Sequence, residues 1–221
     1  MKIAGIDASI NGSAIAVLDI RDDDFEIRDE RYHFFTRKKV DLKLARSGIL
    51  GHHFPEYESK TIRNFHTTAA IRDILQSEDI KYSAIEDYAM GIRNGTVFDI
   101  GEFCGLVKHH LYLDGILFRV YDIPSIKIFA SGNGAADKGV MLTAYKMKIH
   151  SGVDLAELQT AAKSPMSDMI DACWIARMLR VELMLRAGIT TLKDLPDEQR
   201  RIFLRTTKGN PVNILDKGWN Q

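Results

Sequence analysis

The chain has 221 residues, of which 45% are hydrophobic and 27% are charged. This length is typical of one large domain with its own core, and the composition excludes disordered, collagen-like and disulfide-scaffold proteins. No apolar run approaches the roughly 18 residues that a membrane span requires. A strand pattern follows Met1 at once, so we expect no signal peptide, and two cysteines in apolar surroundings favour the reducing cytoplasm.

The charges are balanced over the whole chain but not along it. Thirty Lys and Arg match thirty Asp and Glu, so the net charge of zero by itself predicts no polyanionic partner. Residues 31–72, however, contain nine Lys or Arg and three Asp or Glu. Such a basic segment is typical of nucleic-acid contact, and it is equally compatible with an ordinary solvated loop.

The first part of the chain predicts three consecutive antiparallel strands. Residues 2–7 and 13–20 have strand patterns on either side of a turn at 11–12, and residues 25–35 are the third candidate. The following segment, about 36–60, is rich in Gly, His and basic residues and has no clear periodicity. We expect it to be a long loop inserted into the domain.

Helices and strands alternate in the rest of the chain. The apolar spacing predicts strands at 82–86 and 116–121 and helices at 61–75, 95–113, 124–129, 137–149, 165–185 and 194–205. Antiparallel strands followed by this alternation predict an α/β fold with a mixed sheet and helices on both faces. We expect a main domain over 1–185 and a C-terminal helical extension and tail over 186–221.

Four acidic residues stand out by their positions. Asp7 and Glu86 each end an apolar strand, and strand ends are where α/β sheets place their ligands. Asp168 and Asp171 lie three residues apart at the start of the 165–185 helix, which places both on one face. Each also has a purely structural reading, because Asp caps turns and acids favour the first turn of a helix.

Together, these four carboxylates suggest a site for hard divalent cations. Mg²⁺ takes oxygen ligands and shares its remaining positions with water and substrate phosphates. Two such ions about 4 Å apart can stabilise the attacking and leaving oxygens of a phosphodiester displacement. The sequence has no clustered Cys and His spacing of the kind that binds zinc.

At this point the motifs resemble those of a known family. GIDAS at 5–9, AIE at 84–86, ADK at 136–138 and DMIDA at 168–172 occur in the order found in RuvC-type Holliday junction resolvases. These enzymes belong to the RNase H-like, or retroviral-integrase-like, superfamily. The resemblance covers roughly residues 1–185. The insertion at 36–60 and the tail after residue 186 are more similar to a phage-type or divergent branch, whose compartment would be the host cytoplasm.

The resemblance implies a fold, an activity and a set of site residues. The fold would be an RNase H-like mixed five-stranded sheet, and the activity would be paired nicking of four-way DNA junctions by a homodimer in recombination and repair. Two Mg²⁺ ions, replaceable by Mn²⁺, would be held by four catalytic carboxylates, Asp7, Glu86, Asp168 and Asp171. No nucleotide cofactor and no membrane would be involved.

The resemblance also implies residues that contact DNA. Lys127 and Lys138 match basic residues close to the DNA backbone. Tyr88 and Met90 lie on either side of the position where the family has an aromatic side chain. The remaining candidates are basic residues, Lys38, Lys39 and Arg93.

Three alternatives stay open. A nuclease of the same fold could act as an RNase H on RNA–DNA hybrids or as a flap nuclease. The chain could instead be a non-catalytic junction-binding protein. An actin-like nucleotide-binding fold also begins with a Gly-Ile-Asp hairpin, but it needs a second such domain, and this chain has no second Gly-x-Asp-x-Gly hairpin.

Overall fold

The computed structural model describes residues 1–87, 96–158 and 163–209. The described strands form one six-stranded sheet in the order β4-β3-β2-β1-β5-β6. They are β1 (Lys2–Asp7), β2 (Ala14–Ile20), β3 (Ile27–Thr36), β4 (Ile49–His53), β5 (Ile80–Glu86) and β6 (Leu117–Tyr121). β1, β2 and β3 pair in antiparallel fashion, whereas β4, β5 and β6 each join a parallel neighbour. The sequence prediction of a mixed sheet with three antiparallel strands is confirmed.

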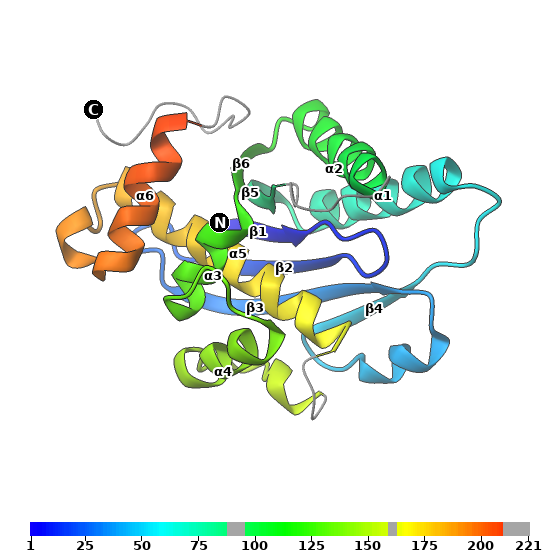
Figure 1. Cartoon of the computed structure of the whole chain (residues 1–221), viewed down its shortest axis with the longest axis horizontal. Coiled ribbons are helices and arrows are strands. Elements are labelled where there is room, and N and C mark those ends of the chain that lie inside the picture. Colours follow the sequence, from blue (N-terminus) through cyan, green and yellow to red (C-terminus); the bar gives the residue numbers. More distant parts are fainter. Residues whose placement is uncertain (88–95, 159–162, 210–221) are drawn as a thin grey trace.

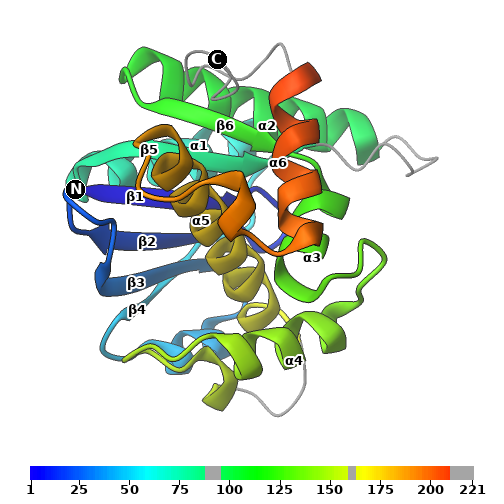
Figure 2. The ribbon, with the colours of Figure 1, turned by 90° about the vertical axis from the view of Figure 1, so that its left-hand side faces the viewer.

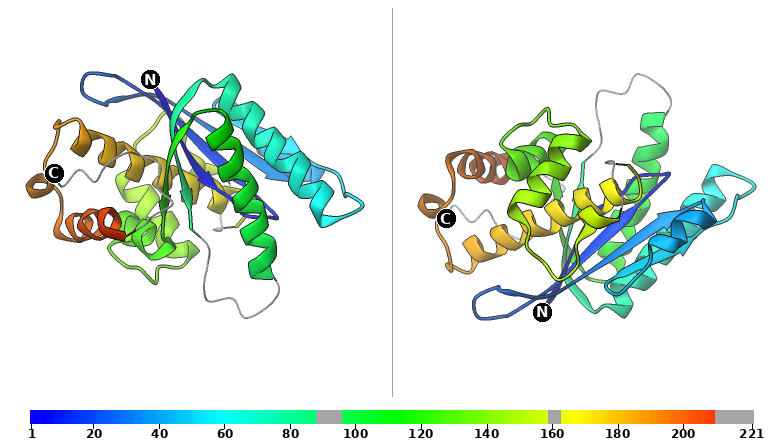
Figure 3. Two further views of the ribbon diagram at one scale, coloured as in Figure 1. Left: turned by 90° about the horizontal axis from the view of Figure 1, so that it is seen from above. Right: turned by 90° about the horizontal axis from the view of Figure 1, so that it is seen from below.

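Helices cover both faces of this sheet (Figure 1). They are α1 (Lys60–Ser77), α2 (Thr96–Leu113), α3 (Ile123–Ser131), α4 (Lys138–Lys148), α5 (Met166–Arg186) and α6 (Asp197–Gly209). One hydrophobic core lies between the sheet and the α1–α2 pair, and a second lies between the sheet and α3, α4 and α5. Figure 3 shows the sheet between these two groups of helices.

The segment 36–60 is not the featureless loop that the sequence predicted. It contains a short 3₁₀ helix, η1 (Lys39–Leu44), and the edge strand β4, so the sheet has six strands instead of five. β4 has no apolar alternation because only Ile49 is fully buried. The strand is held by backbone pairing with β3 and by the His52 ring, which stacks on His33 and Phe35.

Side-chain caps explain where several helices begin. Ser59 precedes α1 and accepts a hydrogen bond from the backbone N–H of Ile62. Asp122 and Asp137 do the same for the first turns of α3 and α4. Each cap satisfies a backbone donor that has no partner inside the helix, so these polar residues set the helix starts.

The C-terminal extension packs against the main body of the fold. A short 3₁₀ helix, η3 (Leu192–Asp194), leads into α6, and Figure 2 shows α6 beside α3. Ile202 and Phe203 of α6 are buried in the same core as α5, and the Phe203 ring lies edge-on to Phe129 of α3. None of the helices in the described ranges combines the length and hydropathy needed to cross a lipid bilayer.

Candidate active site at the carboxyl end of the sheet

Asp7 and Glu86 meet because their strands are parallel neighbours. Each is the last residue of its strand, β1 or β5, and the register pairs Ile6 with Ile85 immediately before them. Parallel neighbours lie about 4.8 Å apart, so residues that follow a registered pair remain adjacent. The two side chains share a hydrogen bond, and Asp7 is 5% exposed.

A close contact between helix and strand brings Asp168 and Asp171 to the same place. A Cβ at Gly5 would lie 2.3 Å from the carbonyl oxygen of Ala172, so only glycine allows α5 to approach β1 this closely. Side chains alternate along a strand, which places Asp7 on the same sheet face as Gly5. Asp168 and Asp171 lie within one turn of Ala172 on the N-terminal side and therefore reach Asp7.

The four carboxylates interact electrostatically. Burial, followed by the charges of Glu86, Asp168 and Asp171, raises the pKa of Asp7 well above its ordinary value. The pKa of Glu86 is raised by burial and by Asp168, while Lys127 acts in the opposite direction. Burial and the charges of Glu86 and Asp168 raise the pKa of Asp171 to about 7. Crowded buried carboxylates of this kind are stabilised by a cation.

Asp168 is held by three further side chains. Ser164 donates a hydrogen bond to Oδ2, and Ser167 donates one to Oδ1 at 3.0 Å. Lys138 Nζ lies 3.4 Å from the same Oδ1 and 2.9 Å from Ser167 Oγ. A Cβ at Gly12 would lie 2.7 Å from Asp168 Oδ2, so the turn after β1 packs directly onto this carboxylate.

No local sequence pattern pointed to Ser164, Ser167 or the roles of Gly5 and Gly12. A serine four residues before an acid on a helix is a weak signal, because serine is common at helix starts. Gly5 was read only as part of a motif, and its need for a bare backbone depends on which helix crosses the strand. That crossing is not visible in the local sequence.

The residues predicted to contact DNA fall into three groups. Lys127 on α3 and Lys138 at the start of α4 act on the carboxylates, and their predicted contact with the DNA backbone stays a prediction. Lys38 and Lys39 are exposed at the start of η1, where the chain leaves β3. The remaining predicted DNA contacts lie outside the described residues; they are Tyr88, Met90 and Arg93.

The donors at this site are carboxylate and hydroxyl oxygens, which are the ligands that Mg²⁺ prefers. Within residues 1–87, 96–158 and 163–209, no three His, Cys, Asp or Glu side chains form a ready-made cage for one ion. Mg²⁺ needs no such cage, since it commonly binds one or two carboxylates together with water and substrate phosphates. The donor chemistry therefore fits a divalent cation that is completed by substrate.

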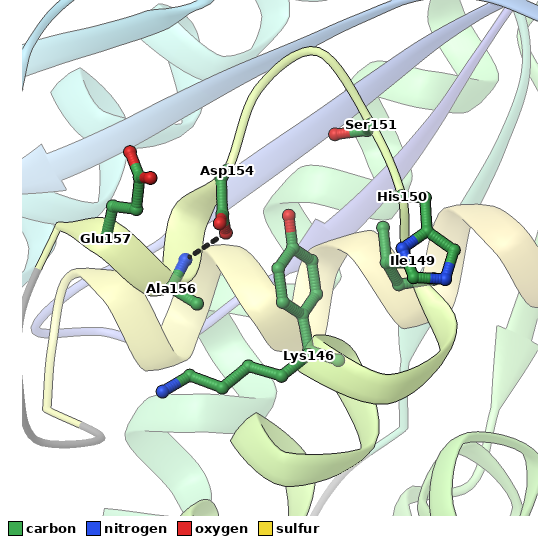
Figure 4. Close-up of a pocket in the computed structure, with 8 residues that line it drawn as sticks. Lys146, Ile149, His150, Ser151, Asp154, Ala156 and Glu157 are labelled. Carbon is green, nitrogen blue, oxygen red and sulfur yellow. Dashed lines mark hydrogen bonds between the residues drawn. The ribbon is translucent and has the colours of Figure 1, made fainter.

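One pocket borders the acidic cluster, and a larger pocket lies away from it. One, of about 210 Å³, is lined by Glu86, Asp87, Cys104 and the turn residues 8–11, next to the acidic cluster. A larger one, of about 680 Å³, lies between the end of α4 and the 3₁₀ helix η2 (Leu155–Glu157) (Figure 4). Its wall includes Lys146 and Asp154 but none of the four carboxylates. The site of interest is the smaller hollow.

Comparison with known proteins adds the fold family. No family model and no curated relative matches the chain. By structure, the chain is similar to Thermus thermophilus RuvC, at 17% identity and a TM-score of 0.54, over 86% of this chain and 99% of that one. The RuvC of T. thermophilus in complex with a Holliday junction substrate gives 18% identity and a TM-score of 0.56, over 86% and 98% of the chains. The chain has a RuvC-type resolvase fold.

A more distant match is the yeast mitochondrial Holliday junction resolvase Ydc2, at 13% identity and a TM-score of 0.47, over 79% of this chain and 75% of that one. The RuvC-type fold that the motifs predicted is confirmed by the similarity to the two T. thermophilus RuvC structures, although little sequence is shared.

Proposed function

We propose that this protein is a metal-dependent, structure-selective DNA endonuclease that nicks four-way or related branched DNA. One observation carries the proposal: four acidic side chains from β1, β5 and α5 converge at the carboxyl end of a RuvC-type sheet. The RuvC of T. thermophilus is seen with a Holliday junction substrate, which supports branched DNA as the substrate class.

The cation in this proposal is Mg²⁺, with two ions per site and Mn²⁺ as a substitute. Asp7, Glu86, Asp168 and Asp171 would hold it. When bound, the metal would lower the pKa of the attacking water and would compensate the negative charge that develops on the departing 3′ oxygen. Such a cation would stabilise the ionised forms of Asp7 and Glu86, which burial and the neighbouring carboxylates otherwise disfavour.

Lysines complete the proposed site. Lys138 neutralises Asp168 in this structure, and its side chain is 58% exposed, so it is free to turn toward a DNA phosphate. Lys127 already favours the ionised forms of Glu86 and Asp171. Both ammonium groups would offset the negative charge that develops on the phosphate. Paired nicks on opposite strands require two sites, so we infer that two copies act as a homodimer.

Cleavage of a labelled four-way junction in Mg²⁺ tests the proposal, with duplex, flap and RNA–DNA hybrid substrates beside it. Symmetric nicks on the junction are expected, and Asp7→Asn should abolish them without loss of DNA binding. Retained cleavage in this isosteric variant would refute the assignment of Asp7. Preferred cleavage of hybrid or flap would keep the metal site but change the substrate, and binding without cleavage would leave a junction-binding protein.

A further inference from the structure

The structure separates the basic residues of segment 31–72 into those with carboxylate partners and those without. The pairs are Arg31 with Glu78, Arg46 with Glu157, Lys60 with Asp99 and Arg72 with Asp114. These four cations are neutralised within the protein and are poor candidates for DNA contact. Two arginines of the segment, Arg37 and Arg63, have no carboxylate within ion-pair distance in the part of the chain that the structure describes.

Arg37 is held where the chain leaves β3. Its guanidinium carbon lies 5.7 Å from the centroid of the Phe54 ring, a cation–π distance. Phe54 is itself buried, and its backbone N–H donates to the carbonyl of Thr36 at 3.1 Å. The ring therefore forms a fixed floor beneath Arg37, whose donors remain exposed to solvent.

Arg63 lies in the first turn of α1, close enough to Arg37 for the two charges to interact. Its Nε and one terminal nitrogen donate to Asn64 Oδ1 at 3.3 and 3.1 Å, which orients the guanidinium plane. Asn64 is completely buried, so its side chain is a fixed support. Arg63 is thus an oriented, half-buried cation with donors left for another partner.

The two arginines repel each other. Burial and then the charge of Arg37 lower the pKa of Arg63, while Asp99 and Glu102 on α2 act more weakly in the opposite direction. Asp99 is already paired with Lys60 at 2.5 Å. Two neighbouring guanidinium groups without a carboxylate between them are costly in the free protein, and an anion bound by both removes that cost.

The pair lies on the same side of the molecule as the candidate active site. β3 and β1 run in the same direction, because each is antiparallel to β2. Asp7 pairs with Ala14 of β2, and Ala14 pairs with Phe34 of β3, so Phe34 lies two strands away from Asp7. Arg37 follows three residues later, and the usual strand spacing and rise place its backbone roughly 15 Å from that of Asp7. Figure 1 shows the turn after β1, the start of α5 and the segment leading into α1 on this side.

We propose that Arg37 and Arg63 together bind a backbone phosphate of the DNA arm that leaves the active site. This inference rests on the proposed function for the identity of the substrate. Guanidinium groups bind phosphate oxygens in a bidentate manner, and the Phe54 floor and Asn64 pre-orient both groups for it. Lys38 and Lys39 directly follow Arg37 in the chain, are exposed, and add positive charge beside it.

The test is junction binding without cleavage, measured by fluorescence anisotropy in EDTA over a series of NaCl concentrations. The variants are Arg37→Gln, Arg63→Gln and the double variant. The double variant should bind several-fold more weakly and should lower the slope of log K against log salt by about one, the value for one phosphate contact. Because both arginines share that phosphate, the two single effects should sum to more than the effect of the double variant.

Arg28→Gln is the matched control. Arg28 is an exposed arginine on the same strand, at its opposite end and about 30 Å from Arg37 by strand length. It should leave affinity and slope unchanged. Arg37→Lys keeps the charge and the fold, and it should retain the slope while losing affinity. Circular dichroism melting checks that each variant folds.

The outcomes separate this inference from the proposed function. The phosphate site is overturned if the double variant keeps the wild-type slope of log K against log salt, or if Arg28→Gln lowers that slope equally. Either result would do so even if the wild type cleaves junctions. A slope reduced only in the double variant supports the site even if no substrate is cleaved. Absence of junction binding by the wild-type protein overturns both.

Discussion

Gly5 of β1 lies directly against the backbone of Ala172 in α5, and a Cβ at residue 5 would come within 2.3 Å of the Ala172 carbonyl oxygen. This one contact sets the distance between the strand that carries Asp7 and the helix that carries Asp168 and Asp171. The obstacle is helix backbone, which cannot turn aside as a long side chain could. The geometry of the acidic cluster therefore depends on a residue that has no side chain.

Gly5→Ala should destabilise the protein by about 1–3 kcal/mol, the usual cost of overpacking a tight core. It should also reduce cleavage, because α5 must move away from Asp7. Urea unfolding measures the stability, and Gly101→Ala in α2 is the control, since a Cβ there meets nothing within 4 Å. In that helix the same substitution should be neutral or stabilising. Equal stability of the Gly5→Ala variant and wild type would contradict the packing argument.

Ser164 and Ser167 should act as positioning residues for Asp168. Removing either hydroxyl takes away one hydrogen bond to the Asp168 carboxylate, so Ser164→Ala or Ser167→Ala should lower the cleavage rate by about 10–100-fold, as loss of outer-shell partners commonly does. The Mg²⁺ concentration for half-maximal rate should rise in the alanine variants. Ser164→Thr keeps a hydroxyl and should retain part of the wild-type cleavage rate. Ser77→Ala at the end of α1 is the control. A lower rate with unchanged Mg²⁺ dependence would argue against positioning.

Asp171 should link stability to pH when divalent cations are absent. Its pKa is raised from 3.8 to about 7 by burial and by Glu86 and Asp168, so the folded protein holds this proton more tightly than the unfolded chain. Ionising Asp171 therefore costs folding stability as the pH rises from about 4 to about 7. Asp171→Asn removes this cost, so its gain in Tm over the wild type in EDTA should be larger at pH 8 than at pH 5.

Thermal melting at both pH values in EDTA and then in Mg²⁺ measures this effect. Bound Mg²⁺ stabilises the ionised carboxylates of the wild type, so the difference in Tm at pH 8 should shrink when the metal is added. An equal Tm difference at both pH values would show that the substitution acts through packing alone.

A buried ion pair links the C-terminal part of α5 to β6 of the sheet. Glu182 is fully buried and accepts from Arg119 of β6 at 2.8 Å and from the Tyr121 hydroxyl at 2.7 Å. Glu182→Gln leaves Arg119 buried without its counter-charge and should cost about 3–5 kcal/mol in urea unfolding. The exposed pair of Asp197 and Arg200 gives the comparison: Asp197→Asn should cost less than about 1 kcal/mol. Similar losses in the two variants would contradict the role of burial.

The local sequence predicted most elements within a few residues of their bounds, because apolar periodicity is a local property. It failed for β4, where a single buried isoleucine is followed by an exposed leucine, a glycine and two histidines. That strand exists because β3 offers an open edge and because His33 and Phe35 offer rings for His52 to stack on. Both are properties of a partner strand, which no local pattern contains.

By itself, the sequence determined which acids end strands or begin a helix, and the order of motifs that resembles RuvC-type resolvases. Only the tertiary structure decided that Lys138 contacts Asp168 and that Ser164 and Ser167 hold the same carboxylate. It also decided which arginines of segment 31–72 are paired and which remain available. The reason is physical: periodicity and caps act between neighbours in the chain, whereas charge pairing and close packing act between neighbours in space.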